Sequence, residues 1–214
     1  FSVIKKSNII GKIEDEIQHK FRLATLLPGA QHLVERLQKE QLATETITLT
    51  GAIRRNCNVI KHIEILIASQ RDWLPIVDKL LLKTVATSDG FAGETAEGFP
   101  VQLYTCSPSE FGTRQFQLTG SADFVTAFLA ATHSTGFPNV RTERELFELA
   151  NLPFIEPEMR EDDWAIELAQ ANQLPNLINT KDVKGVIHSH TTYSDGGATL
   201  RQMVEYTRDQ GYEY

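Results

Sequence analysis

The chain has 214 residues, of which 41% are hydrophobic, and it carries a formal net charge of −7. This length accommodates one large or two small domains, and the hydrophobic share is sufficient for a folded core. The negative charge has the wrong sign for a protein that holds nucleic acid with its whole surface, so a nucleic-acid contact would need a local basic patch.

The cysteines and the apolar runs indicate the cellular environment. Cys57 and Cys106 have neither metal-ligand spacing nor the number needed for a disulfide framework, which predicts a reducing, cytoplasmic compartment. No apolar run reaches the roughly 20 residues of a membrane span, and no signal peptide is visible, so no membrane partner is expected. Because the chain begins at Phe1 and ends at Tyr214, we expect it to be part of a longer protein.

The first 50 residues predict helices followed by a strand. Apolar residues recur at helical spacing over 8–24, and the sequence Leu-Pro-Gly at 27–29 is expected to end this pattern. A second helix is predicted over 30–40. The β-branched run 46–50 then predicts a strand that leads into a glycine turn.

The stretch 51–69, GAIRRNCNVIKHIEILIAS, is central to the interpretation. Its segment 62–67 alternates polar and apolar residues, which predicts a strand. Since side chains two apart on a strand share a face, His62 and Glu64 point to one side and the intervening isoleucines point into a core. Taken alone, this polar pair would be a solvated strand face.

Further elements complete a predicted α/β (α+β) fold with a mixed, mostly antiparallel sheet and helices on one face. A helix capped by Asp72 is predicted to run to Leu82, with strands at 83–87 and 100–106. Gln102 is a polar residue among apolar neighbours in the second of these strands.

The following residues predict a helical region and a polar connector. Helices are expected over 121–134 and 142–150, and Thr142 and Glu145 have the spacing of a capping box. Residues 163–180 are predicted to form a polar, partly helical connector.

The stretch 51–69 resembles the palm signature of family X DNA polymerases, in which a Gly-Ser turn and an Arg-Arg pair precede a strand with Asp-x-Asp. The glycine and both arginines of this signature match, whereas Ala52 stands at the turn serine. The resemblance puts His62 and Glu64 at the two metal-binding aspartates. The matching residues are Gly51, Arg54 and Arg55.

A second segment, 98–121, resembles the other palm segment of the family, in which a strand with an aspartate is followed by a helix and a Thr-Gly-Ser turn beside the nucleotide. The aspartate position holds Gln102, and the residues before the turn, aromatic in the family, are Gln117 and Leu118. The resemblance implies that these nucleotide- or DNA-binding residues are retained: Gly51, Arg54, Arg55, Thr119, Gly120 and Ser121. An ordinary surface or salt-bridging role for the two arginines remains an alternative.

The remainder resembles the later parts of a bacterial or archaeal family X polymerase. Residues 152–162 resemble the exit from the thumb, and the tail resembles the opening of a PHP domain, a metal-dependent phosphoesterase module. The domains expected on this basis are the end of the fingers helices (1–27), a palm (28–121), a reduced thumb (122–160), a connector (161–183) and the first strand and helix of a PHP barrel (184–214).

The tail contains a candidate metal site. His188 and His190 are two residues apart on a predicted strand, and a Ser-Asp-Gly turn with Asp195 follows. An isolated His-x-His pair is a weak signal, but at this place the resemblance implies ligands for a divalent metal, Zn or Mn, in a complete PHP domain. The remaining ligands would lie in later strands, so we expect residues 184–214 to be inactive alone.

The palm positions, in contrast, lack the chemistry of nucleotidyl transfer. The family holds two divalent ions with three carboxylates, and Mg²⁺ prefers such hard oxygen ligands. His62, Glu64 and Gln102 together bring a charge near −1, and each close charge pair near a surface contributes about 4 kcal/mol. We therefore expect no Mg²⁺ in the palm and no templated synthesis.

The function expected from the resemblance is a DNA-binding or scaffold core of a polymerase X-like protein in DNA repair. It would bind gapped or 3′-ended duplex, and 3′–5′ exonuclease or phosphoesterase activity would need the complete PHP domain. Three alternatives remain: an active polymerase with unusual metal ligands, a structural module that binds no DNA, and a small-molecule phosphatase.

Overall fold

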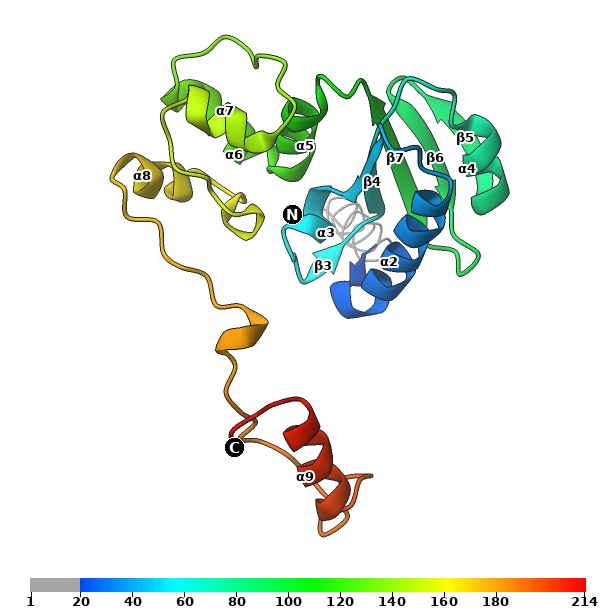
Figure 1. Cartoon of the computed structure of the whole chain (residues 1–214), viewed down its shortest axis with the longest axis vertical. Coiled ribbons are helices and arrows are strands. Elements are labelled where there is room, and N and C mark those ends of the chain that lie inside the picture. Colours follow the sequence, from blue (N-terminus) through cyan, green and yellow to red (C-terminus); the bar gives the residue numbers. More distant parts are fainter. Residues whose placement is uncertain (1–19) are drawn as a thin grey trace, which may run out of the picture. The chain divides into compact units, whose positions relative to one another are not determined.

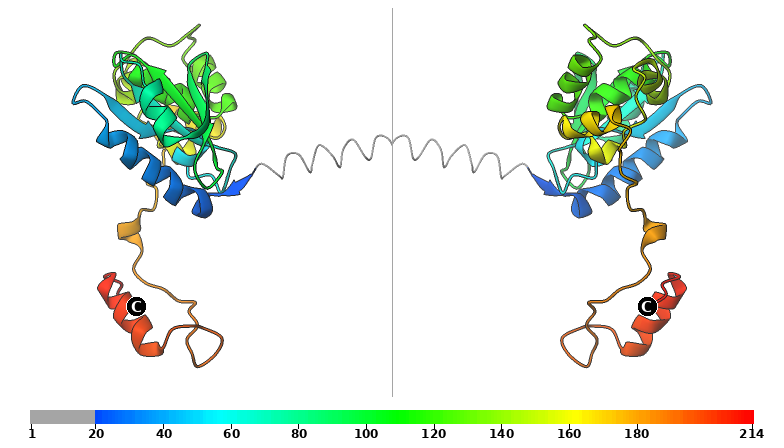
Figure 2. Two further views of the ribbon diagram at one scale, coloured as in Figure 1. Left: turned by 90° about the vertical axis from the view of Figure 1, so that its right-hand side faces the viewer. Right: turned by 90° about the vertical axis from the view of Figure 1, so that its left-hand side faces the viewer.

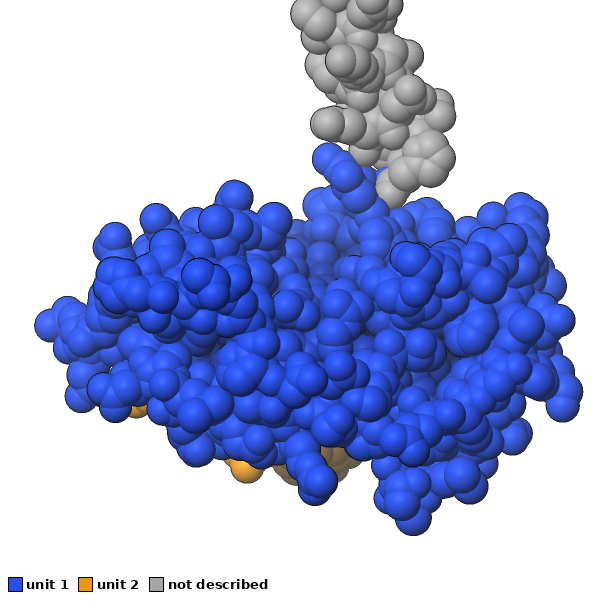
Figure 3. Space-filling view, turned by 90° about the horizontal axis from the view of Figure 1, so that it is seen from above, with its two compact units in different colours: residues 1–174 blue, residues 175–214 orange. Residues whose placement is uncertain are grey.

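The computed structural model describes residues 20–214 and divides the chain into two compact units. The first unit ends at Leu174, and the second covers Pro175–Tyr214. Figures 1 and 3 draw both units, and each is described here by itself.

The first unit contains a five-stranded mixed sheet with the strand order β2-β4-β7-β6-β5. The central strands β4 and β7 are parallel, and the other neighbours are antiparallel. A small antiparallel ribbon of β1 and β3 lies outside this sheet. The strands are β1 (Phe21–Arg22), β2 (Thr46–Leu49), β3 (Val59–Ile60), β4 (Ile63–Ala68), β5 (Leu82–Thr87), β6 (Gly90–Glu94) and β7 (Pro100–Cys106).

Helices α2 (Leu23–Lys39) and α4 (Leu74–Leu80) cover one face of the sheet, as Figure 2 shows for α2. The three isoleucines at alternate positions of β4 are fully buried and pack against these helices. This confirms the predicted fold class and the predicted core face of the central strand. The buried isoleucines are Ile63, Ile65 and Ile67.

A group of short helices follows the sheet, and we call residues 111–174 the helical part and residues 20–110 the sheet part. The helical part has its own core, in which the buried Phe116 ring lies 4.6–5.8 Å from four other phenylalanine rings. Its elements are α5 (Phe111–Thr119), α6 (Ala122–Ala131), α7 (Glu143–Leu149), η1 (Pro157–Met159) and α8 (Trp164–Gln170). Thr142 caps α7 by accepting from the Glu145 N–H at 3.3 Å, which confirms the first half of the predicted capping box. The Glu145 carboxylate accepts from the Arg141 N–H at 3.1 Å and not from the Thr142 N–H.

The predicted helix break at 27–29 is wrong. Helix α2 continues through Pro28, although proline removes one backbone hydrogen bond from a helix interior. Four residues at helical spacing on this helix are buried against the sheet, and this burial outweighs the local signal: Leu26, Ala30, Leu33 and Leu37.

The structure differs from the sequence analysis at two further places. The predicted helix over 8–24 lies outside the described residues as far as residue 19, and its end is wrong, because β1 interrupts it before α2 begins. Strand β6 was not predicted, because its sequence GFAGE has two glycines and no alternating pattern.

The second unit contains η2 (Thr180–Asp182) and α9 (Leu200–Asp209), the latter with a capping box formed by Thr199 and Gln202. None of its residues is buried. The predicted strand that carries His188 and His190 is not formed in the part of the chain that the structure describes. Two backbone hydrogen bonds join this segment to the C-terminal residues, from Val186 to the Tyr214 carbonyl and from Glu213 to the Lys184 carbonyl, and no ladder follows. A strand needs a partner to satisfy its backbone groups.

Within residues 20–214, no helix has both the length and the apolar character required to cross a membrane.

The helical core provides a first test of the fold. Replacing Phe116 with alanine should lower the free energy of unfolding by about 3–5 kcal/mol, because a large cavity would open between the neighbouring rings. Urea unfolding monitored by circular dichroism measures this loss. Ile178→Ala is the control, because Ile178 is 84% exposed, and equal stability of the two variants would contradict the assigned core.

Candidate functional site

The three palm-like positions lie next to one another at the centre of the sheet. Parallel pairing of β4 and β7 places Glu64 opposite Gln102. The prediction that His62 lies on this strand is wrong. Strand β4 begins at Ile63, and His62 is in the bend that precedes it. Its Nε2 nevertheless lies 3.5 Å from the Glu64 Oε1 atom.

The Glu64 carboxylate is held by groups of the protein itself. The Ala52 N–H donates to Oε2 at 3.3 Å, and the Tyr104 hydroxyl donates to Oε1 at 3.4 Å. Gly51 adopts a φ of 65°, and a Cβ atom there would lie 1.7 Å from Oε2. Only glycine therefore permits this approach of the carboxylate to the start of α3 (Gly51–Arg54).

Tyr104 keeps its proton at neutral pH and so remains a donor to Glu64. Burial of the phenol, followed by the charges of Glu64 and Asp89, raises the pKa of Tyr104 to about 12. Sequence reasoning did not identify Tyr104, although it lies two residues after Gln102 and therefore on the same face of β7.

These residues do not fit a two-magnesium site. They offer one carboxylate, one imidazole and one amide, and the carboxylate already accepts two hydrogen bonds. Mg²⁺ requires near-octahedral oxygen ligands and binds imidazole poorly.

Arg54 is bound to the helical part. Its guanidinium donates to both oxygens of Glu143, at 3.0 and 2.6 Å, and to the Thr119 hydroxyl at 2.7 Å. Arg160 donates to the same Glu143 carboxylate at 2.5 Å. Burial raises the pKa of Glu143, but the two arginines outweigh burial and hold this pKa below its usual value.

Arg55 is also paired with a carboxylate. It donates to Glu161 Oε1 at 2.7 Å and to the Thr119 carbonyl at 2.6 Å. The Cys57 thiol lies 2.7 Å from the same Glu161 oxygen. Burial raises the pKa of Glu161, but hydrogen bonds from Cys57 and Arg55 and the Arg55 charge outweigh it, so this pKa is lowered.

The turn at Gly120 and Ser121 lies beside these arginine contacts. Ser121 caps α6 by accepting from the Phe124 N–H at 3.0 Å, and its hydroxyl donates to the Glu161 carbonyl. The structure thus gathers the residues predicted to bind nucleotide or DNA, but carboxylates occupy both arginines. Local motifs gave no signal for Glu143 or Glu161 as partners of the arginine pair, because these contacts join residues 89 and 106 positions apart. Arg160 was not identified either, although it lies 17 positions from Glu143.

The candidate metal residues of the second unit form a chain of contacts. His190 Nδ1 lies 2.5 Å from Asp195 Oδ1, and its Nε2 lies 2.9 Å from Nε2 of His188. The hydrogen bond with His190 lowers the pKa of Asp195. Asp195 is placed to accept from Nδ1 of His190 and to orient its ring, so that the lone pair of His190 lies on Nε2, which faces His188. This is the arrangement of an outer partner of a metal ligand.

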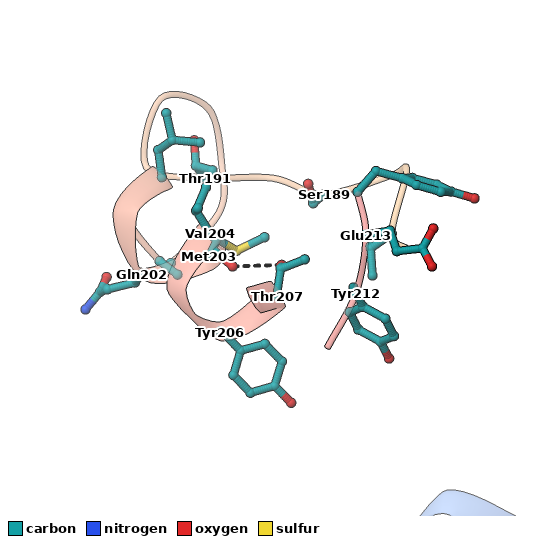
Figure 4. Close-up of a pocket in the computed structure, with 14 residues that line it drawn as sticks. Ser189, Thr191, Gln202, Met203, Val204, Tyr206, Thr207, Tyr212 and Glu213 are labelled. Atoms are coloured by element: carbon teal, nitrogen blue, oxygen red, sulfur yellow. Dashed lines mark hydrogen bonds between the residues drawn. The ribbon is translucent and has the colours of Figure 1, made fainter. Parts of the chain in front are cut away.

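The histidine pair stands apart from the cavity of this unit. Among residues 20–214, no group of three or more His, Cys, Asp and Glu side chains is arranged to hold a metal ion. A cavity of about 860 Å³ lies against α9, and Figure 4 shows Met203 and Tyr206 of this helix beside it. Neither histidine lines this cavity, which is mainly apolar.

Comparison with known proteins supports a relationship to family X polymerases. No protein-family model matches the chain. It is 28% identical over 194 residues to the DNA polymerase/3′-5′ exonuclease PolX of Bacillus subtilis (strain 168). The chain is a partial, distant homologue of PolX. The match covers 77% of this chain and 32% of PolX, so the chain spans about a third of the length of that relative.

The lowered pKa values of Glu143 and Glu161 predict that the protein is less stable in acid. Carboxyls whose pKa is lowered on folding stabilise the protein above their unfolded pKa, about 4.3 for Glu, and lose this contribution as the pH falls. The melting temperature should therefore fall as the pH decreases below about 5. Glu143→Gln should reduce the slope, because the Glu143 side chain is 8% exposed and pairs with both Arg54 and Arg160. An unchanged slope in this variant would contradict the assigned pairing.

Proposed function

We propose that the chain is the core of a PolX-like protein whose palm does not perform nucleotidyl transfer. It acts as a DNA-binding scaffold in repair, and the 3′–5′ exonuclease or phosphoesterase activity belongs to a PHP domain in the full-length protein. The observation that carries this proposal is the single carboxylate at the three metal positions, Glu64, which is held by the Ala52 N–H and the Tyr104 hydroxyl.

Charge supports an inactive palm. Two divalent cations and a triphosphate need compensating negative ligands, and the site offers one carboxylate beside a histidine. At about 4 kcal/mol per close charge pair, the loss of two carboxylates weakens ion binding by several orders of magnitude. The phosphate contacts are altered in the same direction, because Arg54 and Arg55 form ion pairs with Glu143 and Glu161.

The second unit supports the PHP assignment through its histidine pair. His188 and His190 would supply imidazole ligands to Zn²⁺ or Mn²⁺, with Asp195 orienting His190. A bound ion of this kind lowers the pKa of a coordinated water for attack on a phosphodiester. The residues of this chain contribute two ligands and one orienting group, so further ligands must come from elsewhere in the full-length protein.

A structural module that binds no DNA is the second candidate. It is favoured by the pairing of both arginines and by the net charge of −7. Fluorescence anisotropy with gapped duplex separates the two functions. Salt-dependent binding supports the scaffold, since phosphate contacts weaken with salt, and absence of binding at low salt supports the structural module.

Primer extension tests the palm directly. The protein should not extend a primer on gapped duplex with Mg²⁺ or Mn²⁺, and Glu64→Ala should behave like the unmodified protein. The double variant His62→Asp/Gln102→Asp restores three carboxylates and should bind Mg²⁺ at least about tenfold more tightly, because it adds two negative charges. Extension by the unmodified protein that is lost in Glu64→Ala would refute an inactive palm.

Metal analysis tests the histidine pair in the full-length protein. His188→Ala/His190→Ala should lose most bound Zn²⁺ or Mn²⁺ after dialysis, while Asp195→Asn should lose about 10- to 100-fold in affinity, as expected for an orienting partner. His133→Ala is the control, because His133 is exposed in the first unit. Equal metal content in all variants would exclude the pair as ligands.

A further inference from the structure

The junction between the sheet part and the helical part is polar, although each part has an apolar core of its own. Arg54 of α3 and the Thr50 that precedes this helix belong to the sheet part. Thr119, Glu143 and Arg160 belong to the helical part. Hydrogen bonds link the five side chains into one network, with Thr119 contacting Thr50 at 3.2 Å and Arg54 at 2.7 Å.

We propose that Glu143 clamps the two parts into one cooperative body by binding Arg54 on one side and Arg160 on the other. The helical part then keeps one fixed position on the sheet. This conformational device goes beyond the proposed function and does not depend on whether the chain binds DNA.

The backbone holds Glu143 firmly in place. It is the first residue of α7, directly after the Thr142 cap. A Cβ atom at Gly112 would lie 2.3 Å from the Thr142 carbonyl carbon, and the Gly112 N–H donates to the Val140 carbonyl at 2.9 Å. The start of α5 therefore contacts the start of α7 closely, and this contact fixes the backbone position from which the Glu143 side chain extends.

Arg160 forms the arm within the helical part. It is fully buried, donates to the Ile155 carbonyl at 2.9 Å, and its guanidinium lies 5.0 Å and 5.2 Å from the centroids of the Phe154 and Phe147 rings. A buried cation is costly unless it is paired. Glu143 is the carboxylate that forms an ion pair with it among the described residues.

Arg54 forms the arm from the sheet part. Its bidentate contact with Glu143 fixes orientation as well as distance, because Nη1 donates to Oε1 and Nη2 donates to Oε2. Two arginines thus share one carboxylate. Removal of the Glu143 charge leaves the buried Arg160 without its carboxylate and next to the partly exposed Arg54. Separation of the two parts relieves this repulsion, and each part can keep its apolar core.

The contact of Arg55 with Glu161 is a weaker second link. The Glu161 side chain is 50% exposed, whereas that of Glu143 is 8% exposed. Exposed pairs contribute little and buried pairs are strongly destabilising when one partner is removed. The clamp therefore depends mainly on Glu143.

The test is hydrogen exchange of the unmodified 214-residue chain and of Glu143→Gln, without DNA. Amides in 51–57 and 143–161 should exchange about a hundredfold faster in the variant, whereas β4 and β7 keep their protection. Glu148→Gln is the matched control, because Glu148 is exposed on the same helix. Equal exchange in Glu143→Gln and this control overturns the proposal.

A second variant covers the case in which Glu143→Gln does not fold. Arg54→Gln removes the arm of the sheet part and leaves the buried Arg160–Glu143 pair intact. It should accelerate exchange at the junction and turn a single thermal transition into two. Uniform acceleration across both cores, with one transition, overturns the proposal, because it would indicate general destabilisation. Exchange equal to that of Arg141→Gln also overturns it, since Arg141 is an exposed arginine outside the network.

Discussion

The parallel pairing of β4 and β7 is the contact on which the first unit depends. It places two apolar strands at the centre of the sheet, where Ile65 and Leu103 are fully buried. The same register sets Glu64 beside Gln102 on the other face. Once the apolar side is fixed by burial, a shift by one residue would reverse every side chain, so the position of the polar pair follows from the core.

The arginine pair illustrates how one constellation can change its role. An Arg-Arg pair after a glycine turn can face phosphates, and in this structure both guanidinium groups face carboxylates of the helical part instead. Each of the two guanidinium groups that could attract an anion is thus engaged by a carboxylate of the protein. The contacts that position these side chains also join the two separate apolar cores, so the polar junction has a structural role.

The sequence predicted the central strand, its buried face and the α7 cap, because these depend on periodicity and local hydrogen bonds. It did not predict that α2 passes through Pro28, since the burial that favours this helix comes from a sheet formed by later residues. Strand β6 has no pattern of its own and is defined by its neighbours. The partners of Arg54 could not be predicted, because long-range ion pairs leave no local signal.

The contacts of Glu64 explain how a single carboxylate can remain useful in a site that does not fit two metal ions. Its Oε2 atom lies where a Cβ atom of residue 51 would be, so the carboxylate and the left-handed glycine are mutually dependent. The Ala52 N–H gains an acceptor, and Tyr104 gains a partner for a hydroxyl that burial keeps protonated. The turn that places both arginines at the junction is thereby tied to the central strand. Glu64, the one carboxylate among the three candidate metal positions, thus has a structural role that does not require a metal.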